Sequence, residues 1–277
     1  MRAGHAAALL WLLSFGNSQA AETDAAAQRM VQDFNAGKPL VAHVIVALAD
    51  NEYQGIVRVP QSLGDGDQPQ SNLYWGAMYG VKGFLRRSAD WRAVPLPASV
   101  DPQVLERLLF RRDLVRNGKS VTVYLLAEAW QGRQIAGSIR QFLEMTRGQH
   151  AETILVEGRE IAAGGAAHLV AYVGHNGLMD FEVPELRPGA ANASPRVAVV
   201  LACYSDDYFS KLLRPHAAPL VTTDSLMAPE AYVLDAVVKG WFGGASPSEV
   251  IGEAASAFAR YQKIPDRSAR RIFHRNP

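Results

Sequence analysis

Residues 196–205 read RVAVVLACYS, a valine-rich apolar run that ends in the only cysteine of the chain, Cys203. A similar run, AHLVAYVGHNG at residues 167–177, ends in His175 and two glycines. The run at residues 41–49, VAHVIVALA, is apolar on both faces, as a strand buried in a parallel sheet is. We therefore expect the three runs to be strands of one mostly parallel sheet.

Strand and helix patterns alternate along the rest of the chain. Strands are expected at residues 41–49, 121–127, 169–173, 197–202 and 220–222, with a small hairpin at residues 154–156 and 160–162. Helices are expected at residues 25–34, 73–87 (capped by Asn72), 102–116 (capped by Asp101), 133–147, 229–242 and 246–261, the last opening with the capping box Ser246-Pro-Ser-Glu249. Residues 58–72 are expected to form a loop, and the basic tail from Asp266 onward to be loose. The alternation predicts an α/β fold, a mostly parallel central sheet with helices on both faces.

The N-terminus has the pattern of a secretory signal peptide. One arginine, Arg2, precedes the ten-residue apolar run AAALLWLLSF at residues 6–15, which is too short to span a bilayer. Ser18-Gln19-Ala20 places small residues where signal peptidase requires them, so cleavage is expected after Ala20. An uncleaved membrane anchor is the alternative. The predicted organisation is a signal peptide at residues 1–20 and one domain at residues 21–277, exported to the periplasm or secreted, with no membrane span after cleavage.

Composition excludes several classes of function. The net charge is +1, and the chain has neither a basic stripe nor the Cys and His spacing of a zinc module, so no nucleic-acid partner is expected. The sequence has no glycine-rich phosphate loop, and its histidines lack metal-ligand spacing. No cofactor and no metal are therefore expected, and the oligomeric state is left open.

His175 and Cys203 carry the chemical signal. Sites in parallel sheets form where the strands end, and these residues follow two predicted strands. A thiolate is a nucleophile, and a free cysteine has a pKa of about 8.5, so a nearby histidine that takes its proton activates it. Backbone N–H groups past a strand end can stabilise an oxyanion, and those of Cys203, Asn176 and Gly177 are candidates. In an exported protein, a lone buried thiol that is chemically inert is the alternative.

The pair of strand ends resembles the caspase, legumain and gingipain group of cysteine peptidases (clan CD). The residues that carry the resemblance are AHLVAYVGHNG at 167–177 and RVAVVLACYS at 196–205, together with VIVALADN at 44–51. The resemblance implies a caspase-like three-layer sandwich in which Cys203 is the nucleophile and His175 moves the proton. It also implies that Asp50 or Asn51, just past the first strand, orients His175. One departure is clear, because Asn176 stands between His175 and the glycine that follows the histidine directly in that group.

Acidic residues near the strand ends are candidates for binding a basic side chain of the substrate: Glu128, Asp206, Asp207 and Asp224. Solvated charge at the rim of the sheet is the alternative for each. The sequence thus predicts an exported cysteine endopeptidase that acts on a peptide or protein. Two alternatives stay open, a catalytically inactive caspase-like binding module of the cell envelope, and a cysteine hydrolase or amidase that acts on another acyl substrate.

Overall fold

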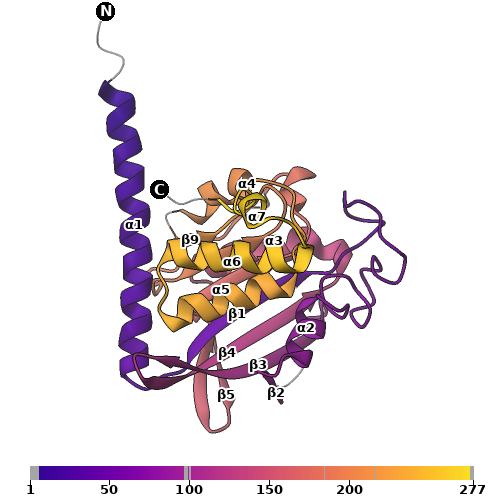
Figure 1. Cartoon of the computed structure of the whole chain (residues 1–277), viewed down its shortest axis with the longest axis horizontal. Coiled ribbons are helices and arrows are strands. Elements are labelled where there is room, and N and C mark those ends of the chain that lie inside the picture. The colour runs from indigo at the N-terminus through magenta and orange to yellow at the C-terminus, as the bar shows by residue number, and fades with distance from the viewer. Residues whose placement is uncertain (1–5, 97–98, 100, 184, 215, 275–277) are drawn as a thin grey trace, which may run out of the picture.

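The structure is a computed structural model that describes residues 6–274 except 97–98, 100, 184 and 215, with side chains from residue 20 onward. It is an α/β protein built on one seven-stranded mixed sheet (Figure 1). The strand order is β2-β3-β4-β1-β7-β8-β9. Five strands are mutually parallel: β1 (Leu40–Ala47), β4 (Lys119–Trp130), β7 (Leu169–Val173), β8 (Val197–Leu201) and β9 (Ala218–Val221). β3 (Val104–Arg116) runs antiparallel to both of its neighbours, β4 and β2 (Arg92–Val94).

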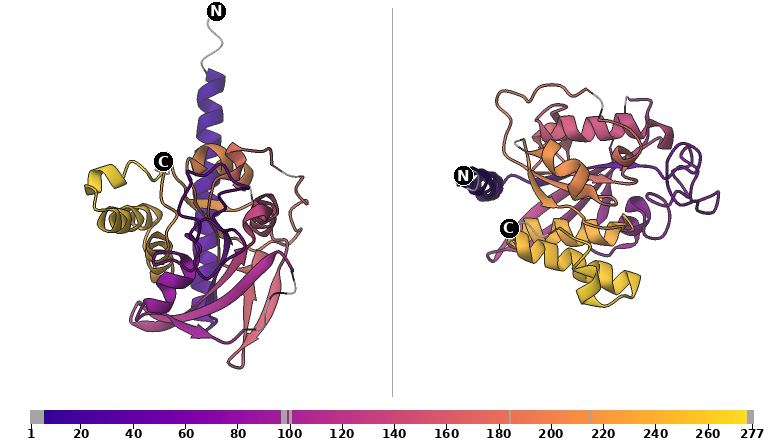
Figure 2. Two further views of the ribbon diagram at one scale, coloured as in Figure 1. Left: turned by 90° about the vertical axis from the view of Figure 1, so that its right-hand side faces the viewer. Right: turned by 90° about the horizontal axis from the view of Figure 1, so that it is seen from above.

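Helices cover both faces of the sheet (Figures 1 and 2). Buried residues of one face pack against α1 (Ala6–Asn35), α2 (Val81–Arg87), α5 (Ala231–Gly243) and α6 (Pro247–Gln262). Those of the other face pack against α3 (Ile135–Thr146), α4 (Ser205–Leu213) and the hairpin of β5 (Glu152–Val156) and β6 (Arg159–Ala163). The predicted parallel strands, the hairpin and the helices near 133–147 and 229–242 are confirmed. Side chains of β1, β7 and β8 are buried along the whole length of these strands.

The predicted signal peptide lies partly outside the described residues, because residues 1–5 are not described. Residues 6–20 form the first half of α1, which extends away from the sheet in Figure 1. The second half of α1 is held to the domain by Arg29, which donates to the carbonyls of Ala166, Ala167 and Pro195. Among the helices that the structure describes, none is long and apolar enough to cross a membrane.

The helix expected at residues 102–116 is wrong, because this segment is the long strand β3. β3 and β4 form a hairpin whose turn is Asn117-Gly118, and both residues have positive φ, 49° and 73°. Asn-Gly is the preferred sequence of a two-residue hairpin turn, since it tolerates positive φ at both positions. The pairing of β3 with β4 therefore outweighs the helix-start signal of Asp101 and Pro102.

The helix expected at residues 73–87 is confirmed only for α2, which begins at Val81. Asn72 does not cap that helix. Its side chain accepts from the backbone N–H of Ala49 and donates to the carbonyl of Ala49, at 3.0 and 2.8 Å. Asn72 thus ties the loop to the end of β1. Gly76 makes the following turn possible, since a Cβ there would lie 2.0 Å from the Gln70 carbonyl oxygen.

The C-terminal segment is packed rather than loose. The capping box at Ser246 is confirmed and starts α6. α7 (Asp266–Ala269) follows, and Phe273, 1% exposed, forms a β-bridge with Thr223 just beyond β9. The tail was predicted to be loose because its composition is basic, but the large apolar side chain of Phe273 packs in the core and anchors it.

Candidate functional site

Register brings the two predicted reactive residues to equivalent positions. Val173 pairs with Leu201 at the ends of the parallel neighbours β7 and β8, and His175 and Cys203 each follow by two residues. Adjacent strands lie about 4.8 Å apart, so the two backbones leave the sheet side by side. The side-chain amide of Asn176 donates to the carbonyl of Cys203 at 2.7 Å and joins the two turns. The asparagine that departs from the clan CD pattern therefore links the turns that carry His175 and Cys203.

The strand order adds a second reason to place a site here. Numbered along the chain, the five parallel strands lie in the order 2-1-3-4-5, so the direction of winding reverses between β1 and β7. In open α/β sheets, ligands bind beyond the carboxyl ends of the strands at such a switch point. His175 follows one of these two strands, β7, by two residues.

The imidazole of His175 is held by Asp180. The Nε2 atom lies 2.6 Å from Oδ2 of Asp180, and the His175 side chain is 10% exposed against 41% for Asp180. The Tyr172 hydroxyl donates to the carbonyl of His175 at 2.8 Å, which fixes the backbone. With Nε2 donating to the carboxylate, Nδ1 is the ring nitrogen that can accept a proton. No residue that the structure describes forms a hydrogen bond to this Nδ1.

Cys203 sits half-buried on a sharp turn between β8 and α4. The next residue, Tyr204, has φ of 50°, the left-handed region that non-glycine residues rarely adopt. Such strain costs on the order of 1–3 kcal/mol and is concentrated at functional sites. The Sγ atom lies 3.5 Å from the backbone nitrogen of Met227, which donates to it, and 3.6 Å from the carbonyl of Met227. Among the described residues, none of the hydrogen bonds of Sγ goes to His175.

Tyr74 is buried in the neighbourhood of Cys203. Burial raises the pKa of the Tyr74 hydroxyl above its ordinary value, and the nearby Cys203 and Glu230 add to that effect. The hydroxyl of Tyr172 is likewise buried, and burial raises its pKa. Both phenols therefore stay protonated at neutral pH, so neither serves as a base near the thiol.

Two of the three predicted oxyanion donors remain free for that role. The N–H of Gly177 donates to the carbonyl of His175 at 3.1 Å and is engaged within the turn. No described residue accepts the N–H of Cys203 or of Asn176. Gly177 itself is required by packing, because a Cβ there would lie 2.6 Å from the ring of Phe181.

Asp50 and Asn51 do not hold His175, contrary to expectation. Asp50 accepts from the backbone N–H groups of Glu52 and Tyr53, at 2.9 and 3.1 Å, and closes its own turn. Asn51 exchanges two hydrogen bonds with the backbone of Val59. Both residues shape the loop after β1, which is the ordinary role of Asp and Asn in turns.

Asp180 makes the contact that was expected of Asp50 or Asn51. Asp180 was not predicted because it does not lie at the end of a predicted strand. The signal that could have found Asp180 is its position five residues after His175, beyond the short 3₁₀ turn Gly177–Met179. That turn carries the chain back toward the imidazole ring.

The four acidic residues predicted to bind substrate have different surroundings. Glu128 lies inside β4 rather than past it, is 4% exposed, and pairs with Arg107 at 3.0 Å. Asp206 accepts from Thr222 at 2.9 Å, and Asp224 lies 2.8 Å from His274. These three carboxylates are therefore engaged by the chain itself. Asp207 and Asp224 are both exposed, and Asp207 lies in the first turn of α4.

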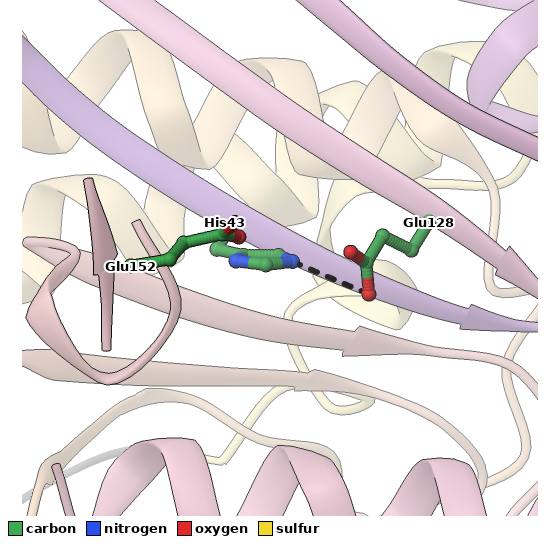
Figure 3. A group of neighbouring side chains, drawn as sticks. All are labelled: His43, Glu128 and Glu152. Atoms are coloured by element: carbon green, nitrogen blue, oxygen red, sulfur yellow. Dashed lines mark ion pairs between the residues drawn. The ribbon is translucent and has the colours of Figure 1, made fainter. Parts of the chain in front are cut away.

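Figure 3 shows how Glu128 lies beside His43 and Glu152. Their ligand atoms lie within 4.8 Å of one another, which is close enough to suggest a metal site. The chemistry does not fit. Nδ1 of His43 accepts the N–H of Gly164 at 2.9 Å, so the neutral ring carries its proton on Nε2 and has no lone pair there for a metal. Arg107, paired with both carboxylates, supplies the positive charge.

A second group, Asp206, Asp224 and His274, forms at the C-terminal tail. The ring nitrogen Nδ1 of His274 lies 2.8 Å from Asp224 and 3.5 Å from Asp206. The sequence analysis missed this group because it treated the tail as loose. Its hydrogen bonds hold the tail against the end of β9, and we assign it to that structural role.

Comparison with known proteins adds no relative. No protein-family model matches the chain, and neither the curated proteins nor the solved structures contain a match. The functional argument therefore depends on the geometry described above.

Proposed function

We propose that this chain is an exported cysteine endopeptidase with a caspase-like three-layer architecture, in which Cys203 is the nucleophile and His175 is the proton carrier. The observation that carries the proposal is the pairing of the two residues at the same register beyond neighbouring parallel strands. Asp180 on Nε2 of His175 and the strained Tyr204 beside Cys203 support it independently. Export is supported by the signal-peptide pattern of residues 1–20.

The mechanism follows from these positions. Nδ1 of His175 takes the thiol proton, and Sγ of Cys203 attacks the carbonyl carbon of the substrate. The N–H groups of Cys203 and Asn176 stabilise the oxyanion, and the protonated His175 then gives its proton to the leaving amine. Water hydrolyses the acyl-enzyme with His175 again as base. Asp180 is a positioning residue, since it fixes the ring and the nitrogen that carries the proton.

The thiol must move from its contact with Met227 for the proton to pass directly to His175. Catalytic hydrogen bonds are often long in the absence of substrate and tighten when it binds. This same contact favours the second candidate, a binding module in which the thiol stays inert. A cysteine hydrolase or amidase that acts on a non-peptide acyl group uses the same residues as the peptidase.

The test is hydrolysis of a mixed peptide library by the purified chain and by Cys203→Ser and His175→Ala variants. We expect cleavage by the unchanged protein and none by either variant, with unchanged circular dichroism. His216→Ala is the matched control, because His216 precedes the amino end of β9 and the proposed site lies beyond the carboxyl ends of the parallel strands. Full cleavage by either site variant contradicts the assignment, and loss of cleavage in the control shows that the effect is not specific.

A further inference from the structure

A groove lies beside Asp180, the hydrogen-bond partner of the proposed catalytic residue His175. It has a volume of about 480 Å³ and lies between the segment 178–183 and Tyr208. The first wall follows His175 in the chain and includes its partner Asp180, and the second stands on α4, which follows Cys203. Both walls of the groove thus belong to the segments that leave the two reactive positions.

The lining of this groove is mainly apolar. Leu178, Met179, Phe181, Val183 and Tyr208 contribute apolar or aromatic side chains. Met179 is 44% exposed and Tyr208 is 38% exposed, although both are large apolar groups that burial stabilises. Ligand pockets combine such apolar walls with a few polar groups that set orientation.

Charge in the groove does not favour a basic occupant. Asp180 is already engaged by His175 at 2.6 Å. Glu182 is exposed at the rim, where water and salt screen its attraction for a cation. Elsewhere at this edge of the sheet, Glu128, Asp206 and Asp224 are engaged by the chain's own Arg107, Thr222 and His274.

We infer that this groove binds an apolar side chain, aromatic or branched aliphatic, next to the bond that is cleaved, an inference that rests on the proposed function. Burial of the exposed faces of Met179 and Tyr208 by that side chain supplies the binding energy. The substrate class is therefore a peptide with a large apolar residue beside the scissile bond, in place of the Arg or Lys that the acidic residues suggested.

The test measures the rate of Cys203 alkylation by three reagents: iodoacetamide, its N-phenethyl derivative and its N-(4-aminobutyl) derivative. We expect the phenethyl reagent to exceed iodoacetamide by at least about tenfold, the effect of burying a ring of that size. We expect the aminobutyl reagent to show no such gain. In Tyr208→Ser and Met179→Ser, the ratio of the phenethyl rate to the iodoacetamide rate should fall toward one. Leu155→Ser is the matched control, since Leu155 is an exposed apolar residue on the β5–β6 hairpin, and it should keep the ratio.

The experiment distinguishes a failure of the apolar groove from a failure of the proposed function. An aminobutyl rate equal to the phenethyl rate, or a ratio unaffected by Tyr208→Ser, overturns the apolar groove while the reactive thiol stands. If Cys203 reacts with none of the three reagents, the proposed function fails. The groove is then tested by saturation-transfer NMR with N-acetylphenylalanine amide, where no signal, or one unaffected by Tyr208→Ser, overturns it.

Discussion

Glu128, which the sequence proposed as a substrate-binding residue, is instead part of a buried ion-pair network centred on Arg107. The Nε atom of Arg107 lies 3.0 Å from Oε1 of Glu128, and the Arg107 side chain is 13% exposed against 6% for the carboxylate. Arg107 also pairs with Glu152, while His43 approaches Glu128 only to 3.6 Å. Arg107→Met therefore leaves a buried carboxylate with only the ring N–H groups of His43 and Trp130 near it.

We expect Arg107→Met to lower the free energy of unfolding by about 3–5 kcal/mol, the usual cost of removing one partner of a buried pair. Arg107→Met/Glu128→Leu should recover most of that loss, because an apolar pair needs no solvation. The recovery should fall short by about 1–3 kcal/mol, because the Nε2–H of His43 stays buried and loses the Glu128 carboxylate beside it. Urea unfolding followed by tryptophan fluorescence measures each value.

Arg111→Met is the matched control on the same strand. Arg111 pairs with Glu157 at 2.8 Å, but the two side chains are 25% and 36% exposed. An exposed pair of this kind contributes at most about 1 kcal/mol. A loss below about 1 kcal/mol for Arg107→Met, or a double variant no more stable than the single one, refutes this reasoning. Glu128 would then be free to serve as a specificity group after all.

The dependence of the free energy of unfolding on pH, in the acidic range, gives a second measure of the same network. Burial raises the pKa of Glu128, but interactions with His43 and Arg107 outweigh it, so this pKa lies below its ordinary value. The carboxylate then stabilises the fold above the pKa of the unfolded chain, and this stabilisation is lost as pH falls through the lowered folded value. Arg107→Met should shift that loss to higher pH.

Three further predictions concern separate parts of the molecule. Asp180→Asn should lower Cys203 alkylation or peptide cleavage by at least about tenfold and change its pH profile. Because the Asp180 carboxylate is 41% exposed, this change should cost at most about 1 kcal/mol of stability. A purely structural role for Asp180 predicts the reverse, a loss of stability with little change in the rate or its pH profile. Burial, helped by Arg29, lowers the pKa of His168 to about 4. As pH falls, His168 of the unfolded chain therefore takes up a proton before that of the folded chain does. The free energy of unfolding should fall by roughly 3 kcal/mol between about pH 6.5 and 4. His168→Gln should remove this pH dependence, and an unchanged dependence in urea titrations contradicts the prediction. Ser246→Ala removes the capping box of α6 and should cost about 1 kcal/mol, with Ser248→Ala as the control.

Local sequence patterns were sufficient for the parallel core. Valine-rich runs such as residues 197–202 admit few other structures, and their order placed His175 and Cys203 at one edge of the sheet. The β3 strand was missed because its charged residues mimic a helix surface. Only its pairing with β4 and the Asn117-Gly118 turn determine its conformation.

The partners of the site residues were harder to predict because they depend on side-chain directions. Asp50 and Asn51 are near the switch point in sequence, yet their side chains turn back to their own loop. Asp180 reaches His175 only because a 3₁₀ turn reverses the chain. Glu128 was expected just past a strand, but β4 continues three residues beyond the predicted end, to Trp130, so Glu128 lies inside it.

Alkylation of Cys203 by iodoacetamide across pH tests the central claim most directly, because it requires no substrate. Only a thiolate reacts, so a thiol activated by His175 should react at pH 6.5 at a rate close to that at pH 9. In His175→Ala, the rate at pH 6.5 should fall to about a tenth or less of the rate at pH 9. A Cys203 that reacts only after unfolding, or a pH profile identical in the two proteins, contradicts the account and leaves the binding module as the better description.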